Sequence, residues 1–379
     1  MIVAAMVFAA GAASAIYFLS NDGDDGKIIG KDVDFVGRGI DPVENLNGGI
    51  VAIGQDSFRW MTYFGLADKC VMIDTNDRMN FMGKAFMFVG RAQADVGDSD
   101  DDYTHANCAM TPKDVEHIFS IGPSVVIVPE EFYTEYANEY RSLVRYGLNV
   151  VSIGLIYTFL DPGTFRIADA LDAQINLLQK VFSNVLDTDR GKELKDAING
   201  TVEDILSLSS QVTQRKSGYI GALAYSGAHG ADSSLTYYMP FALAGVDNIM
   251  DNGERYKHGD PGVKTYSANV ISERIKDDTL LFLCATGLYM CTDNTSKGVI
   301  QLFQGHEAYI AVPYIWTGMN FENVLVAAYQ ILKDAYGLLT QSELDAKIDN
   351  VYALFLGSSV SNRNMEVFGV GIPAPGTTV

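Results

Sequence analysis

The stretch Thr111–Val128, TPKDVEHIFSIGPSVVIV, decides the fold class because it joins a helix to a buried strand through one break. Thr111 can cap the helix, and Pro112 stands at the first helical position, where a missing N–H costs nothing. Gly122-Pro123 ends the helix. The run Val125–Val128 is apolar at every position, which is typical of a strand covered on both faces.

The same alternation extends in both directions from this stretch. Expected strands lie at 48–54, 70–74 and 148–153, and expected helices at 57–64 and 131–146. Short apolar strands that alternate with helices predict a parallel sheet with helices on both faces. The first half of the chain therefore predicts one α/β lobe.

Apolar residues then recur at helical spacing from about 165 to 186, with a break near 187–191 and a second helix over 192–212. A long helix between two α/β halves is a stiff connector. The second half alternates again, with expected strands at 217–223, 263–266, 279–284 and 308–312 and expected helices at 269–275, 321–336 and 341–355. We predict an α/β protein: two Rossmann-like lobes with mostly parallel sheets, joined by one long α-helix.

The predicted organisation follows from these patterns. Its parts are a membrane anchor or signal segment (1–20), a spacer (21–47), an N-terminal lobe (48–164), a connecting backbone helix (165–190), a C-terminal lobe (191–360) and a tail (361–379).

Composition limits the functions available. The chain has 379 residues, 48% of them hydrophobic, and a formal net charge of −20. An acidic surface repels phosphate backbones, so nucleic acid is not an expected partner. The acidity suits solubility in an extracellular medium, or an acidic face that docks a basic membrane partner.

The first segment predicts export. Residues 2–19 carry no charge, and an acidic, Gly-rich stretch over 21–26 follows at once. Such a run nearly spans a bilayer core. No Lys or Arg precedes it, so a cleaved signal and an uncleaved anchor both remain open. We expect the protein at the outer face of the membrane or in the periplasm, tethered by this segment.

Four cysteines do not decide the compartment. Cys70, Cys108, Cys284 and Cys291 form no CxxC pair and no zinc-like cluster. Cys284 and Cys291 could pair under oxidising conditions. Cys70 lies in an apolar run, and we expect it to be buried.

Several stretches together resemble a known family. Ile50–Ile53 and Tyr63–Val71 are similar to the opening of ABC-importer binding proteins for iron–siderophores, haem and cobalamin. Thr111–Ile127 resembles the family's helix followed by a buried strand, and the helix near 165–186 stands where its backbone helix joins the lobes. Tyr219–Ala222 and Ala244–Asn248 resemble the start of the family's C-terminal lobe, and Ile348–Gly357 resembles a closing helix found in many members.

The resemblance, over roughly 48–357, implies a function. It implies a substrate-binding protein, not an enzyme, that captures a metal-containing ligand between its lobes and delivers it to an ABC permease and its ATPase. A monomer without an intrinsic cofactor is expected. One position departs from the family: where many members have a Glu that docks the permease, this chain has Arg59.

Ligands of open α/β sheets bind outside the carboxyl ends of the strands. Arg59 and Arg91 could hold an anion, His229 could bind a metal, and aromatic side chains suit a bulky chelate. The candidate ligand-binding residues are Gln55, Ser57, Phe58, Arg59, Trp60, Arg91, Tyr157, Tyr225, His229, Ser233, Thr286, Tyr314 and Trp316.

Three alternatives stay open. The ligand could be an oxyanion such as molybdate or tungstate on the same scaffold. The protein could be a surface receptor that has lost transport. A metal-cluster enzyme of related shape would need converging Cys or His ligands, and only five His and four Cys are present.

Overall fold

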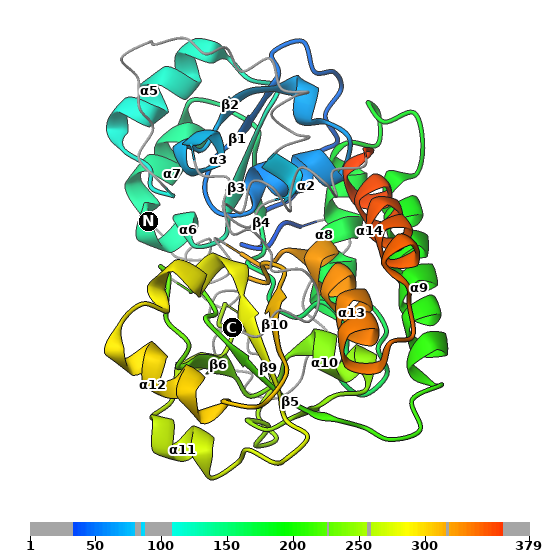
Figure 1. The fold of residues 1–379 in the computed structure, drawn as a ribbon. Coiled ribbons are helices and arrows are strands. Elements are labelled where there is room, and N and C mark those ends of the chain that lie inside the picture. Colours follow the sequence, from blue (N-terminus) through cyan, green and yellow to red (C-terminus); the bar gives the residue numbers. More distant parts are fainter. Residues whose placement is uncertain are drawn as a thin grey trace. The chain divides into compact units, whose positions relative to one another are not determined.

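The computed structural model describes residues 33–79, 85–87, 108–225, 227–255, 259–315 and 318–358, apart from the side chains of Arg78, Met79 and Tyr289 (Figure 1). The described chain forms two compact units. The first contains residues 33–79, 108–155 and 168–193. The second contains 85–87, 156–167 and the described residues from 194 onward.

The first unit is built on a four-stranded parallel sheet with the order β2-β1-β3-β4. Its strands are β1 (Ile50–Ala52), β2 (Cys70–Ile73), β3 (Val125–Pro129) and β4 (Val150–Ile153). The helices are α2 (Ser57–Tyr63), η1 (Ala67–Lys69), α3 (Thr75–Met79), α5 (Pro112–Ile121), α6 (Phe132–Glu135), α7 (Ala137–Arg145) and α8 (Asp169–Val181).

Both faces of β3 are covered, as its apolar run predicts. Val126 and Val128 pack in one core cluster with Ile118 of α5 and Leu143 of α7. Successive strand residues point to opposite faces, so Ile127 lies on the other face, and it too is fully buried. Continuous burial of this kind explains why the strand carries no polar alternation.

The start of α5 confirms the predicted cap. The Thr111 side chain accepts a hydrogen bond from the Asp114 N–H, and the Asp114 carboxylate accepts one from the Thr111 N–H. This reciprocal capping box satisfies two N–H groups that a helix start would otherwise leave unpaired. Gly122 ends the helix at φ 65°, a conformation that favours glycine.

The second unit has a four-stranded parallel sheet with the order β10-β9-β5-β7. Its strands are β5 (Ser217–Gly221), β7 (Asp247–Asn248), β9 (Leu280–Cys284) and β10 (Ala308–Ala311). A separate antiparallel pair joins β6 (Ser233–Leu235) to β8 (Val263–Thr265).

Helices cover this second sheet as well. They are α9 (Arg190–Ser209), α10 (Met239–Ala244), α11 (Ala268–Ser272), η2 (Ala285–Met290), α12 (Asn294–Leu302), α13 (Phe321–Tyr336) and α14 (Gln341–Leu356). Leu281 and Leu283 of β9 pack in a core cluster with Ile271 of α11 and Val299 of α12. Phe282, between them in sequence, contacts the ring of Phe241 in α10. The predicted α/β class with mostly parallel sheets is confirmed.

The connecting helix differs from the predicted 165–190. Residues 160–168 are not helical, because the Asp161 carboxylate accepts hydrogen bonds from the N–H groups of Gly163 and Thr164 and holds a turn. Leu160 then bridges Ile167 as in a strand. The helix shared by the two units is α9, since residues up to 193 belong to the first unit and residues from 194 to the second.

Three helices of the second unit meet at one carboxylate. Asp204 Oδ2 of α9 accepts a hydrogen bond from the Tyr329 hydroxyl of α13 at 2.5 Å. The same oxygen forms an ion pair with Lys347 Nζ of α14 at 2.6 Å. The Lys347 ammonium also lies 5.6 Å from the Tyr329 ring centroid. The Lys347 and Tyr329 hydrogen bonds hold the pKa of Asp204 below its usual value against the opposing effect of burial.

The predicted membrane segment, residues 2–19, lies outside the described residues. Among the helices that are described, none combines the length and apolarity needed to cross a bilayer.

Removing the Tyr329 hydroxyl tests the helix junction. Tyr329→Phe deletes a hydrogen bond to a carboxylate and should lower the free energy of unfolding by about 1.5–3 kcal/mol. Urea unfolding followed by circular dichroism measures the change. Tyr146→Phe removes the same atom from a 51% exposed side chain and should have an effect below about 0.5 kcal/mol. Equal midpoints for the two variants would contradict the role of the junction.

Candidate functional site

The carboxyl edge of each parallel sheet, the side where its strands end, gathers the loops that the sequence predicts to bind a ligand. In the first unit these loops follow β1, β2, β3 and β4. Asp74 directly follows β2 and is 1% exposed. Its carboxylate accepts hydrogen bonds from the N–H of Gly54 at 3.0 Å, of Asn76 at 2.9 Å and of Cys108 at 3.1 Å. One side chain thus joins three segments at this edge.

A second pair of side chains joins the loops after β3 and β4. Glu130 Oε1 accepts a hydrogen bond from the Leu155 N–H at 2.9 Å, and Gln174 Oε1 of α8 accepts one from the Gly154 N–H at 2.8 Å. These bonds satisfy the N–H groups of a chain that has just left the sheet. The edge is therefore held by polar side chains reaching across from neighbouring loops.

Arg59 is the most informative of the predicted residues. Its side chain is fully buried, and its guanidinium pairs with the Asp56 carboxylate one helical turn earlier. Asp56 has φ 68°, a left-handed conformation that turns the chain into α2. In this arrangement the charge of Arg59 is already neutralised. An anion could reach the guanidinium only if the pair opened.

The loop after β3 carries a carboxyl group with an altered acidity. Burial, together with the smaller effect of the neighbouring carboxylates of Glu135, Asp56 and Glu130, raises the pKa of Glu131 to about 7. Both causes disfavour the ionised form. At neutral pH this carboxyl group can therefore donate a hydrogen bond as well as accept one.

In the second unit, the Gly-rich loop after β5 folds back on itself. The Ala222 N–H donates to the Gly230 carbonyl at 3.1 Å, and a His229 ring nitrogen lies 2.8 Å from the Tyr225 carbonyl. Ser233 donates to the carbonyls of Leu223 and Gly230, both at 3.0 Å. His229 and Tyr225 are half-buried, while Ser233 is buried.

Gly287 brings the loop after β9 against the loop after β5. A Cβ atom at this position would lie 2.2 Å from the carbonyl oxygen of Ala222 and 2.4 Å from that of His229. No side chain fits at these distances, so the close approach of the two backbones requires glycine. Thr286, just before it, is buried and hydrogen-bonded to the Cys284 thiol at 3.0 Å.

The loop after β10 is tied to two helices. Asn323 of α13 donates to the Pro313 carbonyl at 2.7 Å and accepts from the Tyr352 hydroxyl of α14 at 2.8 Å. Tyr314 is fully buried, and its ring lies edge-on to Tyr238 at 4.9 Å. This loop is therefore positioned by the core.

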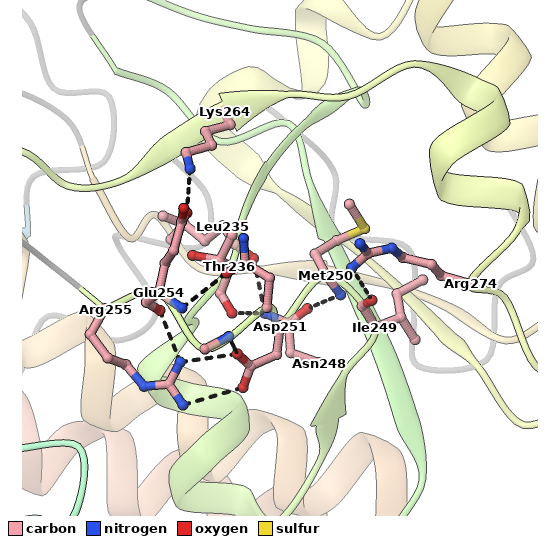
Figure 2. A network of polar contacts seen from close by, with 12 residues as sticks. Leu235, Thr236, Asn248, Ile249, Met250, Asp251, Glu254, Arg255, Lys264 and Arg274 are labelled. Atoms are coloured by element: carbon pink, nitrogen blue, oxygen red, sulfur yellow. Dashed lines mark hydrogen bonds and ion pairs between the residues drawn. The ribbon is translucent and has the colours of Figure 1, made fainter.

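A polar network holds the segment after β7 (Figure 2). Asn248 donates to the Leu235 carbonyl of β6 at 2.9 Å, and Arg255 binds both oxygens of Asp251 at 3.0 and 3.4 Å. The Arg255 guanidinium also lies 4.6 Å from the Tyr237 ring centroid. Sequence reasoning did not identify this network, because it joins residues of β6, β7 and the segments that follow them.

The remaining predicted residues fall into three groups. Four are buried in this conformation, each at most 3% exposed: Ser57, Phe58, Trp60 and Tyr157. Gln55 is half-buried at the end of β1. Arg91 and Trp316 lie outside the described residues. The ligand-binding roles stay predictions.

The metal prediction rests on His229 alone. In the described part of the chain, no group of three or more His, Cys, Asp or Glu side chains could hold an ion. The thiols of Cys284 and Cys291 are free, and Cys291 lies 3.7 Å from the Gly287 carbonyl. Burial raises the pKa of the Cys291 thiol to about 11, and burial also raises the pKa of the Cys284 thiol. Cys70 is buried, as predicted.

Sequence reasoning missed the side chains that hold the edges together. Asp74 and Glu130 each follow an apolar strand directly, and that position was the available signal. Asn323 lies in the first turn of α13, a largely buried helix, where its sequence context marks nothing unusual. Its role becomes visible only with its partners in place.

Solved structures share this fold. The molybdate-bound periplasmic binding protein MolA of Haemophilus influenzae superposes with a TM-score of 0.58 at 14% identity, covering 86% of this chain and 98% of that one. The haem-binding protein HutB of Vibrio cholerae gives 0.51 at 12%, covering 76% and 100%. The petrobactin-binding protein YclQ of Bacillus subtilis gives 0.50 at 16%, covering 82% and 98%.

No family model matches the sequence, and no curated protein matches it either. All three of these neighbours are described as binding proteins, and MolA is the periplasmic binding protein of an ABC transporter. The fold that the sequence resemblance implied is therefore confirmed.

Glu131 predicts a pH dependence of stability. Its pKa is about 7 in the folded protein and near the ordinary glutamate value of 4.5 when unfolded, so between these values the folded state holds the extra proton. The free energy of unfolding should therefore fall as pH rises through this window, by roughly 1–2 kcal/mol after allowance for solvent screening. Urea unfolding at pH 5 and pH 8 measures this.

Glu131→Gln mimics the protonated form and should remove that fall, which makes the variant more stable than the parent at pH 8. The exposed Glu116→Gln is the matched control and should keep the parental pH profile. An unchanged profile in Glu131→Gln would show that this carboxyl group is not the cause.

Gly287 predicts a sharp steric effect. Gly287→Ala should destabilise the protein by about 1–3 kcal/mol, because the new methyl group must push two carbonyls aside. Gly298→Ala in α12 has open space at its Cβ and should be neutral or stabilising by up to about 1 kcal/mol. Thermal unfolding of the two variants compares them. Similar losses in both would refute the close approach.

Proposed function

We propose that the protein is the substrate-binding component of an ABC importer. It captures a metal-containing small ligand, such as an iron–siderophore, haem or a corrinoid, and delivers it to a membrane permease. The observation that carries this proposal is the fold match, which covers 86% of this chain and 98% of a molybdate-binding protein. Both units also end their parallel strands in the loops where α/β proteins bind ligands.

The described part of the first carboxyl edge favours a chelate over a bare oxyanion. Arg59 is neutralised by Asp56, and Glu130 and Glu131 stand after β3. Carboxyl groups repel a free oxyanion, whereas a chelate presents hydroxyl or amide donors that carboxyl groups bind. A half-protonated Glu131 suits such a surface, because it can both donate and accept.

A molybdate-type oxyanion is the second candidate, and one observation favours it. MolA, which was solved with molybdate, shares the fold. In this chain Gly227 is exposed in the loop after β5, and a residue without a side chain lets an anion approach its backbone. Ligand binding would then rest on the second unit.

The partners follow from the proposed role. We infer an ABC permease and its ATPase in the membrane, a monomeric binding protein, and export with tethering by residues 1–20. Docking to the permease cannot use Arg59 in this conformation, because a fully buried side chain cannot form an intermolecular ion pair. Another exposed residue must take the part that a Glu plays at this position in the resembling family.

Ligand titration tests the proposal. Intrinsic fluorescence and native mass spectrometry with a ferric catecholate, a ferric hydroxamate, haem, cobalamin and molybdate should show one-to-one binding of one class. A Kd of about 1 μM or tighter is expected for an import protein. Absence of binding by all of these ligands would overturn the proposal, and binding of molybdate alone would favour the second candidate.

His229→Ala separates a metal-contact role from a structural one. It should weaken binding of a ferric or haem ligand at least tenfold if the imidazole touches the metal complex. His117→Ala on α5 is the control and should bind as the parent does. Unchanged affinity in His229→Ala would assign the imidazole to its hydrogen bond with the Tyr225 carbonyl.

A further inference from the structure

Two aromatic rings stand exposed side by side on the first unit. Phe119, near the end of α5, is 52% exposed, and Tyr146, just after α7, is 51% exposed. Their ring centroids are 4.7 Å apart. Most of the large apolar side chains of this protein are buried, so a contiguous exposed aromatic pair indicates an interaction surface.

The exposed charges on the two helices that carry or precede this pair differ in sign from the net charge of the whole chain. The chain has 47 acidic and 27 basic residues, yet three of the four exposed charged side chains on α5 and α7 are positive: Lys113, Arg141 and Arg145 against Glu116. Glu139 on α7 is half-buried, as is His117 on α5. Among the described residues, neither Arg141 nor Arg145 forms an ion pair. Their charges remain available to a partner.

The start of the described chain is fastened to the same helix. Arg38 donates from Nη1 to the Tyr140 hydroxyl of α7 and to the Val150 carbonyl, both at 3.1 Å. Its guanidinium also lies 5.7 Å from the Tyr140 ring centroid. The spacer residues 21–32 can span at most about 40 Å even when fully extended. A membrane that held residues 1–20 would therefore lie within reach of α7.

We propose that Phe119, Arg141, Arg145 and Tyr146, called here the α5–α7 face, dock the protein on an anionic lipid surface. The arginines bind lipid phosphates, and the two rings enter the headgroup layer, where aromatic side chains are favoured. The proposal goes beyond ligand capture. It gives the tethered protein a preferred contact with the membrane. Without this contact, the overall negative charge of the protein would be repelled by an anionic membrane.

Tryptophan quenching tests the proposal on the full chain. Phe119→Trp keeps an aromatic ring and places a probe on the face, while Val270→Trp places one at an exposed site of the second unit. Each variant is mixed with phosphatidylcholine vesicles that contain, or lack, brominated phosphatidylglycerol. The emission of the parent protein is subtracted. The Phe119→Trp probe should be quenched by the anionic vesicles, and the Val270→Trp probe should not.

Charge reversal adds the decisive control. Arg141→Glu with Arg145→Glu should lower the quenched fraction at least fivefold, since each basic residue near an anionic surface contributes roughly a fivefold change in partition. Arg166→Glu with Lys297→Glu changes net charge equally at exposed sites elsewhere and should leave the quenching intact. Salt at 0.5 M should also reduce it, because the attraction is screened.

Several results would overturn the proposal. The first is equal quenching of the Phe119→Trp and Val270→Trp probes. The second is quenching of the Phe119→Trp probe that persists in the Arg141→Glu, Arg145→Glu variant. The third is an absence of quenching of the Phe119→Trp probe by the anionic vesicles, whether or not the chain associates with them. A concentration-dependent emission shift of Phe119→Trp without lipid would assign the face to a second copy of the chain. Ligand titration is a separate measurement, so failure here leaves the proposed function standing.

Discussion

The structure depends on the burial of parallel strands from both sides. A strand such as Val125–Pro129 has no solvent-facing side, so helices must cover both faces of its sheet. Parallel pairing then brings all the carboxyl ends to one edge, and each chain segment must turn there into a helix or loop. The place where a ligand can be held is thus a consequence of how the strands are buried.

The two edges are held by different means. In the first unit, carboxylates and an amide bridge the loops: Asp74 binds three segments, while Glu130 and Gln174 hold the chain after β4. In the second unit, the loops after β5 and β9 are held together by close backbone contact at Gly287. The first arrangement leaves carboxyl groups at its edge, whereas the second depends on a residue without a side chain.

Local signals predicted much of the fold. The capping box at Thr111, the glycine stops and the apolar strands lie where the sequence indicates them, because each depends on neighbours within a few residues. The predicted connecting helix begins at Asp169 and not at 165, since Asp161 holds a turn before it, and the boundary between the two units falls in α9. For the candidate site, the ligand-binding roles of the predicted loops stay predictions, and the sequence did not show the charge state within them. Arg59 looked available for an anion and is instead paired and buried.

The sequence by itself determined the class of the fold, the order of its helices and strands, and the loops that end each strand, because these follow from periodicity and turn chemistry over short distances. Only the tertiary structure decided that Asp56 neutralises Arg59, that neighbouring carboxylates raise the pKa of Glu131, and that Gly287 must lack a side chain. The effects on Glu131 and Gly287, like the burial of Arg59, depend on packing between strand ends and loops that are distant along the chain. Burial and the local electric field are set by such packing, and no short stretch of sequence contains them.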